Sequence, residues 1–178
     1  DAYLMELYHG PTSAFKDIAL TLLPHLLIQS YNKENRHDTI SILTATSGDT
    51  GKAALSGFAD VKHTAITVFY PEVGVSQVQK KQMQTATGDN VEVIAVKGNF
   101  DDCQRMVKEA TQDPQVLASL HNVTISSANS INVGRLIPQV VYYYSSYCKL
   151  VKDGAIQCGD PVNFIVPTGN FGDILAGY

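Results

Sequence analysis

The sequence predicts an α/β fold in which a parallel sheet is flanked by helices. Short stretches rich in β-branched residues recur along the 178 residues, and segments with apolar residues at helical spacing lie between them. Neither an internal repeat nor a low-complexity tract interrupts this alternation. Because strands that alternate with helices form βαβ units, we expect parallel strands joined by right-handed crossovers.

Five stretches have the composition of short buried strands, and a proline or glycine follows several of them. They are residues 39–44, 65–70, 91–96, 123–126 and 162–166.

The intervening helices are predicted from apolar spacing and from capping residues. Thr12 or Ser13 can cap the first helix, and Ser76 can cap the third. Pro24 and Pro138 each predict a late start or a kink. The last helix is apolar almost all round, so we expect it to be buried. The predicted helices cover residues 18–28, 50–58, 77–87, 100–112 and 135–151.

Composition excludes several classes of function. The net charge is −4 and the 13 basic residues are scattered, which argues against a nucleic-acid partner. No apolar run reaches bilayer length, so we expect no membrane association. The three cysteines show no CxxC pairing, which indicates neither a zinc site nor a disulfide framework and favours a reducing cytoplasm. The composition does not indicate an oligomeric state.

The two ends of the sequence lead us to expect an internal fragment of a longer polypeptide. The chain begins at Asp1 rather than at a methionine, and it ends at Tyr178, shortly after a glycine-rich turn that should start a helix. A helix cut within its first turns cannot bury its apolar face.

Lys16 is the first candidate reactive group. It follows the turn-rich segment that begins at His9 and precedes the apolar run of the first helix. A lysine at such a junction acts as a nucleophile when its surroundings lower its pKa. The alternative is a surface lysine in the first turn of a helix, and position alone favours that alternative.

Three polar or glycine-rich segments follow predicted strands, where a turn and a helix N-terminus together can bind an anion. Residues 168–173 contain two glycines, which let the backbone approach a phosphate; the alternative is a plain βα turn. Residues 46–51 add hydroxyl groups, and there Ser47 or Asp49 can instead cap a helix. Residues 129–135 end in Arg135, which suits either a phosphate or a salt bridge at a domain junction.

Together these segments resemble the threonine synthases, which are fold-type II pyridoxal-phosphate enzymes. The matching blocks fall in that family's order and approximate spacing across nearly the whole chain. They are residues 9–17 (HGPTSAFKD), 46–51 (TSGDTG), 127–132 (SANSIN) and 167–173 (PTGNFGD). The resemblance implies a lyase with pyridoxal 5′-phosphate as cofactor. In threonine biosynthesis it would convert O-phospho-L-homoserine and water into L-threonine and phosphate.

The resemblance also implies roles for individual residues. Lys16 would join to the cofactor and carry protons in catalysis. Asp49 stands where many relatives have an asparagine that contacts the cofactor ring hydroxyl, so both a cap and a direct ligand remain open for it. The expected cofactor-phosphate residues are Gly169, Asn170, Phe171, Gly172 and Asp173, and the expected substrate-binding residues are Ser47, Gly48, Asp49, Thr50, Ser130, Asn132 and Arg135.

The same resemblance implies a division of the chain. Residues 1–19 would belong to a large cofactor domain, residues 20–133 to a small mobile α/β domain, and residues 134–178 to the large domain again. The fragment alone is expected to be inactive, because the group that contacts the pyridine nitrogen should lie outside it. Two alternatives remain: a serine or threonine dehydratase-like lyase on the same scaffold, and a non-catalytic α/β module that binds a phosphate ligand. The form of the lysine block and a second anion site near Arg135 favour the synthase.

Overall fold

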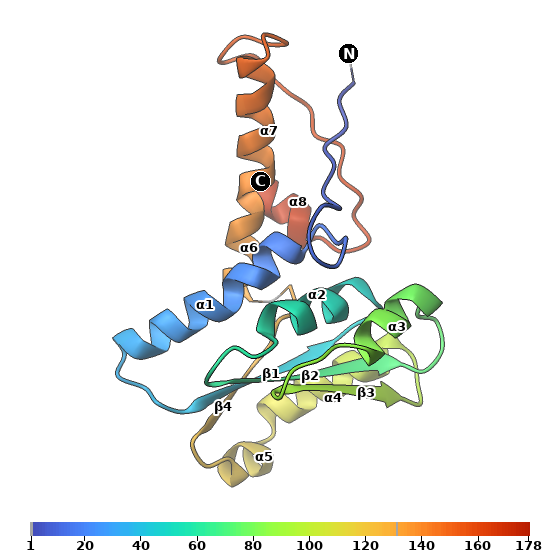
Figure 1. Cartoon of the computed structure of the whole chain (residues 1–178), viewed down its shortest axis with the longest axis vertical. Coiled ribbons are helices and arrows are strands. Elements are labelled where there is room, and N and C mark those ends of the chain that lie inside the picture. The colour runs from blue at the N-terminus through green and yellow to red at the C-terminus, as the bar shows by residue number, and fades with distance from the viewer. Residues whose placement is uncertain (1, 131) are drawn as a thin grey trace.

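A four-stranded parallel sheet, with helices packed on it, makes up the lower part of the molecule in Figure 1. The structure is a computed structural model that describes residues 2–130 and 132–178. The strands have the order β3-β2-β1-β4 and confirm the predicted α/β class. They are β1 (Thr39–Ala45), β2 (Thr64–Pro71), β3 (Val91–Val96) and β4 (Val123–Ser126).

Helices cover both faces of this sheet (Figure 1). On one face lie α1 (Asp17–Lys33), α2 (Asp49–Phe58) and α3 (Gln77–Gln84), and on the other lie α4 (Phe100–Gln112) and α5 (Pro114–Ser119). The two helices α1 and α2 pack against each other, which brings the start of α1 close to the start of α2. This packing positions the candidate site.

Successive residues of β1 point to opposite faces of the sheet, which explains why an apolar cluster lies on each face. Ile40 and Ile42 belong to the larger apolar cluster beneath α1 and α2, whereas Leu43 and Ala45 belong to a smaller cluster beneath α4. The larger cluster contains the fully buried residues Leu20, Leu23, Ile40, Ile42, Ala54, Phe58, Val68 and Met83. Burial of this apolar surface is the main force that holds the helices on the sheet.

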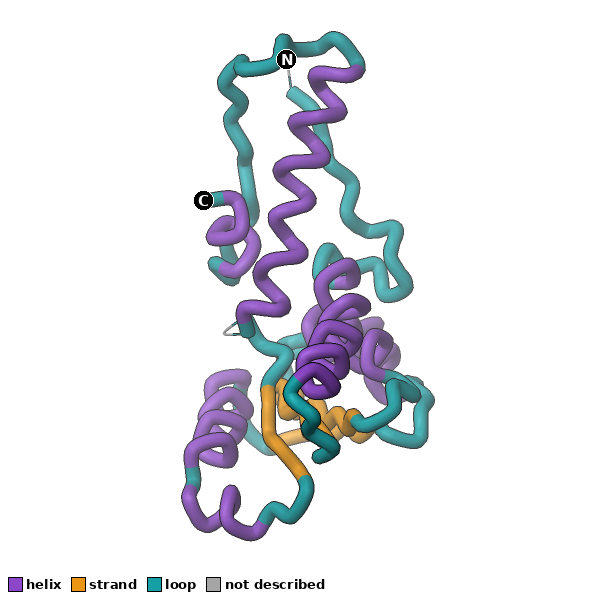
Figure 2. The backbone as a smooth tube through the Cα atoms, turned by 90° about the vertical axis from the view of Figure 1, so that its left-hand side faces the viewer, coloured by secondary structure: helices purple, strands orange, loops and turns teal. Residues whose placement is uncertain are grey.

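A second group of elements lies beyond the sheet. It comprises α6 (Val133–Leu136), the 3₁₀ helix η1 (Ile137–Gln139), α7 (Val140–Lys152) and α8 (Gly172–Gly177). Figures 1 and 2 show α7 projecting away from the sheet, with the N-terminal segment and the stretch before α8 running beside it. No helix of residues 2–130 and 132–178 has the length and hydropathy needed to cross a membrane.

Two sequence-based expectations are wrong in this second group. Residues 162–166 are not a strand, because an extended segment becomes one only beside a partner strand and the sheet does not reach them. The helix predicted over 135–151 breaks at Pro138, as its proline predicted, into α6, η1 and α7. Its predicted burial fails, because within α7 only Tyr142 is buried and Tyr144 is 72% exposed.

Candidate active site

The turn before α1 is organised by a carboxylate. Asp17 accepts hydrogen bonds from the backbone N–H groups of Thr12 (2.9 Å) and Ala14 (3.3 Å), and from the Thr12 hydroxyl. The prediction that Thr12 or Ser13 caps the helix is therefore wrong. Lys16 itself occupies the N-cap position, and the helix begins at Asp17.

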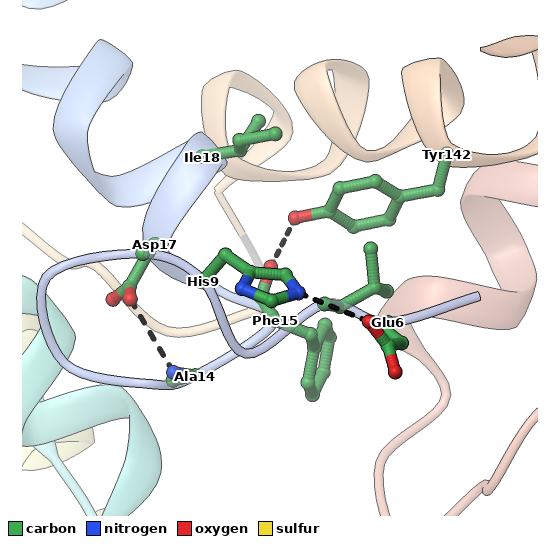
Figure 3. Close-up of a pocket in the computed structure, with 9 residues that line it drawn as sticks. Glu6, His9, Ala14, Phe15, Asp17, Ile18 and Tyr142 are labelled. Atoms are coloured by element: carbon green, nitrogen blue, oxygen red, sulfur yellow. Dashed lines mark hydrogen bonds and ion pairs between the residues drawn. The ribbon is translucent and has the colours of Figure 1, made fainter.

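Two further features fix the conformation of this turn. A β-carbon on Gly10 would lie 2.4 Å from Asp17 Oδ2, so only glycine lets the chain pass this close to the carboxylate. The Tyr142 hydroxyl of α7 donates a hydrogen bond to the Phe15 carbonyl oxygen (Figure 3). The backbone around Lys16 is thus fixed by local contacts of the turn and by one residue distant in sequence, Tyr142.

The Lys16 side chain is largely buried, with 12% of its surface exposed, and its Nζ lies 4.0 Å from Asp49 Oδ2. Burial lowers the pKa of Lys16 to about 8. The positive charges of Arg135 and Lys52 lower this pKa further, and the negative charge of Asp49 opposes the shift. A lysine with this pKa is a neutral, nucleophilic amine in roughly a tenth of molecules at pH 7.

Asp49 faces this amine instead of capping its own helix. The N-cap residue of α2 is Gly48, and just before it Thr46 Oγ1 accepts from the N–H groups of Gly48 and Gly51, each at 2.9 Å. The Asp49 carboxylate accepts a hydrogen bond from Gln79 Nε2 at 2.7 Å. Lys52 Nζ lies 3.4 Å from the same carboxylate. Of the neighbouring predicted residues, Ser47 is exposed and Thr50 is buried.

Sequence reasoning missed both Thr46 and Gln79 as functional neighbours. Thr46 lay inside a block already assigned to substrate, with Ser47 and Asp49 as the obvious caps. For Gln79 a signal existed, since Ser76 and Gln79 have the spacing of a capping box. The Ser76 side chain does accept from the Gln79 N–H (3.3 Å), as predicted for a cap, but the nitrogen of the Gln79 side-chain amide donates to Asp49.

The segment after β4 uses its amide groups to shape the backbone. Asn129 hydrogen-bonds to both backbone groups of Ala45 at the end of β1. Asn132 caps α6 through the Gly134 N–H (2.9 Å) and donates to the Ser127 carbonyl oxygen (2.9 Å). The Asn132 side chain therefore has a structural role that its assignment to substrate did not anticipate.

Arg135 is a buried cation, with only 2% of its surface exposed. Its Nη1 donates to the Ala128 carbonyl oxygen at 2.8 Å, and its Nε has no hydrogen-bond acceptor among the residues that the structure describes. Burial lowers the pKa of Arg135 to about 10. A guanidinium with so few partners can offer its charge to an anion.

The glycine-rich turn before α8 lies against the 127–132 segment. Asn170 Oδ1 accepts from the Ser130 hydroxyl and from the Gly172 N–H, both at 2.9 Å. Asp173 accepts through its carbonyl and carboxylate oxygens from the Tyr143 hydroxyl, at 2.9 and 3.2 Å. Burial raises the pKa of Asp173. Its carboxylate is thus held by α7, while Gly169 and Phe171 are exposed.

We call the turn from Gly10 to Asp17 the lysine turn. A cavity of about 300 Å³ lies beside it, between the N-terminal segment and α7 (Figure 3). It is lined by residues that include His9, Phe15, Asp17 and Tyr142, whereas the Lys16 amine lies toward Asp49. We place the candidate site at Lys16 and Asp49, because the charged groups gather there. Among residues 2–130 and 132–178, no three His, Cys, Asp or Glu side chains are grouped to hold a metal ion.

The site and the parallel sheet together define a class of protein. All 178 residues match the family model described as "Pyridoxal-phosphate dependent enzyme", and the chain belongs to this family. Its cofactor is pyridoxal 5′-phosphate.

Particular relatives narrow the similarity to threonine synthases. The chain is 46% identical to threonine synthase of Pseudomonas aeruginosa, over 99% of this chain and 35% of the relative. It is 43% identical to human threonine synthase-like 1, over 98% of this chain and 24% of the relative. The crystal structure of threonine synthase from Brucella melitensis, with the cofactor bound, matches with a TM-score of 0.82 and 42% identity. That match covers 98% of this chain and 36% of the other.

The chain therefore spans between a quarter and about a third of the length of these relatives. The fold-type II resemblance and the fold class are confirmed by these matches.

Proposed function

We propose that the complete protein is a threonine synthase, a lyase that converts O-phospho-L-homoserine and water into L-threonine and phosphate. The observation that carries this proposal is the Lys16 amine, which is largely buried, has a pKa lowered to about 8 and faces the Asp49 carboxylate. The relatives named threonine synthase at 45% and 46% identity support the choice of reaction.

Lys16 would hold the cofactor covalently and carry protons between substrate carbon atoms. The cofactor supplies an electron sink when bound. Because its pKa lies near neutrality, the Lys16 Nζ can both accept and release a proton under working conditions. The fixed turn from Gly10 to Asp17 would return the amine to the same place after each transfer.

The cofactor phosphate would be held by the turn before α8, through Gly169, Asn170, Phe171, Gly172 and the backbone of Asp173. A β-carbon on Gly172 would lie 3.1 Å from Asn170 Oδ1 and 3.2 Å from Ser130 Oγ, whereas a β-carbon on Gly169 would meet nothing within 4 Å. The turn is thus tight on its Ser130 side and open at Gly169, which leaves room for an anion.

The substrate would be held by two segments. Ser47, Gly48, Asp49 and Thr50 would lie near its carboxylate, and Ser130, Asn132 and Arg135 near its phosphate. The Nε of Arg135, which has no acceptor among residues 2–130 and 132–178, supports the second assignment. With its own amide engaged in capping α6, Asn132 would act by shaping the backbone of this segment.

The proposed domain division places residues 1–19 and 134–178 in a large domain and residues 20–133 in a small mobile one. The arrangement in Figure 1 supports it, because the N-terminal segment and α7 lie together at one end and the sheet lies at the other. In this proposal, movement of the sheet toward the lysine turn would close the site and exclude water.

Labelling of Lys16 tests the enzyme class. The complete protein would be mixed with pyridoxal 5′-phosphate, reduced with borohydride and mapped by peptide mass spectrometry. We expect the label on Lys16 and not on Lys52, which provides an internal control because it lies beside the same carboxylate. Label absent from Lys16 would contradict the proposal.

Substrate assays then separate the synthase from its alternatives. We expect release of phosphate and formation of threonine from O-phospho-L-homoserine, and no oxo acid from L-serine or L-threonine. Oxo-acid formation alone would indicate a dehydratase. Lack of any turnover by a labelled, folded protein would indicate a different substrate.

A further inference from the structure

Gln79 joins α3 to the charged centre of the site, although no sequence motif assigned it a role there. Its Nε2 donates to Asp49 Oδ1 at 2.7 Å, across thirty residues of sequence. Its Oε1 accepts from the Ser76 hydroxyl at 2.9 Å. Both ends of the amide are therefore engaged, which fixes the direction in which the donor points.

The backbone beneath Gln79 is shaped to admit its side chain. Gly48 has a φ of 147°, a conformation that L side chains rarely adopt. A β-carbon at this position would lie 2.2 Å from Gln79 Oε1. The glycine of the 46–51 segment thus makes room for the amide that reaches Asp49.

The Asp49 carboxylate requires such a partner to stay in place. Its side chain is 40% exposed, so without a fixed contact it could rotate toward water. The hydrogen bond holds Oδ1 beside Lys52 Nζ (3.4 Å) and leaves Oδ2 facing Lys16 Nζ (4.0 Å).

We propose that Gln79 is a positioning residue that holds the Asp49 carboxylate between the ammonium groups of Lys16 and Lys52. Its consequence for catalysis rests on the proposed function, in which Lys16 is the reacting amine. Through Asp49, Gln79 sets how strongly Lys16 retains its proton.

Three charged groups from two elements act on the Lys16 amine. Asp49 and Lys52 come from α2, and Arg135 comes from α6. Asp49 is the only one of these three whose charge attracts the proton of Lys16. Loss of its fixed position should therefore lower the pKa of Lys16, and an added negative charge beside it should raise that pKa.

The test measures the pKa of Lys16 in the complete, cofactor-free protein. A brief pulse of acetic anhydride at a series of pH values, read by peptide mass spectrometry, gives the neutral fraction of the amine. Lys152 is an exposed internal reference. We expect Gln79→Leu to lower the pKa by roughly half to one unit and Gln79→Glu to raise it by a similar amount.

Gln84→Leu is the matched control, because Gln84 also lies at α3 and donates a side-chain hydrogen bond, to the Tyr70 hydroxyl at 3.1 Å. It should leave the pKa of Lys16 unchanged. Ser76→Ala removes the hydroxyl that contacts the far end of the Gln79 amide and caps α3, and it leaves the Gln79 donor in place. It should lower the pKa of Lys16 less than Gln79→Leu does, and it provides the test if the Gln79 variants do not fold. Equal shifts for the leucine and glutamate variants, or no shift in any variant, would overturn the proposal.

Failure of this inference and failure of the proposed function are distinguishable. The pKa readout requires no cofactor, whereas the proposed function is tested by labelling of Lys16 with pyridoxal 5′-phosphate and by the substrate assays.

Discussion

The side-chain amide of Asn129 hydrogen-bonds to both backbone groups of Ala45, the last residue of β1. Its Nδ2 donates to the carbonyl oxygen at 2.8 Å, and its Oδ1 accepts from the N–H at 3.2 Å. The β1–β4 pairing has already ended at Ile42. The Asn129 amide thus continues the hydrogen bonding along this edge of β1 beyond the last β4 residue. It also attaches residues 129–135, the candidate substrate-binding segment, to the sheet.

Asn129→Ala should lower the free energy of unfolding by about 1–3 kcal/mol, because it leaves backbone groups of Ala45 without partners. Urea unfolding followed by circular dichroism measures the change. Asn163→Ala is the control, since Asn163 is exposed and should change stability by less than about 0.5 kcal/mol. Equal effects of the two substitutions would contradict the structural role of Asn129.

Gly10→Ala should destabilise the lysine turn. The added β-carbon would lie 2.4 Å from Asp17 Oδ2, so the carboxylate must move away from the N–H groups of Thr12 and Ala14. We expect a loss on the order of 1–3 kcal/mol, measured by thermal unfolding. Gly169→Ala serves as control, because a β-carbon there meets nothing within 4 Å. A Gly10→Ala protein as stable as the control variant would show that the turn adapts freely.

The lowered pKa of Lys16 predicts a specific dependence of stability on pH. The pKa is about 8 in the folded chain and 10.5 for an unperturbed lysine. Between these values the unfolded state binds more protons, so this group makes the free energy of unfolding rise with pH from about 8 to 10.5.

Lys16→Met should remove that dependence. The variant should be more stable than the parent at pH 7, where burial of the ammonium is unfavourable, and its advantage should shrink by pH 10. Unfolding midpoints in urea at several pH values measure this difference. An advantage that stays constant with pH would be incompatible with a lowered pKa at Lys16.

The three cysteines should differ sharply in reactivity. Cys103 is buried in the cluster beneath α4, and burial raises its pKa, whereas Cys148 and Cys158 are exposed. A thiol-specific reagent should therefore modify two thiols quickly in the folded protein and the third only on unfolding. Rapid modification of Cys103, located by mass spectrometry, would show that α4 does not stay packed on the sheet.

The sequence predicted those parts of the fold that depend on local pattern. The bounds of β3, β4 and α4 agree with the prediction, because β-branched composition marks the two strands and apolar residues at helical spacing mark α4. The structure adds an Asn99 cap immediately before α4. Residues 162–166 show the limit of this approach, since β-branched composition indicates an extended backbone but not a neighbouring strand.

The same distinction, between features set by local sequence and features set by distant segments, applies to the candidate site. Lys16 and Asp49 stood out within short motifs, and the structure brings them together. The contact of Gln79 with Asp49 could not be predicted, because it depends on how α3 packs against α2. The contact between Ser130 and Asn170 likewise joins two segments forty residues apart.

The Tyr142 hydroxyl that supports the Phe15 carbonyl oxygen comes from 127 residues further along the chain. During synthesis the lysine turn emerges from the ribosome first, yet this support exists only after α7 has been made and has docked. Closing so large a loop is entropically costly and slow compared with forming local turns. The surroundings of Lys16 should therefore mature late in folding, so that a nascent or partly folded chain does not yet display its reactive amine in the native setting.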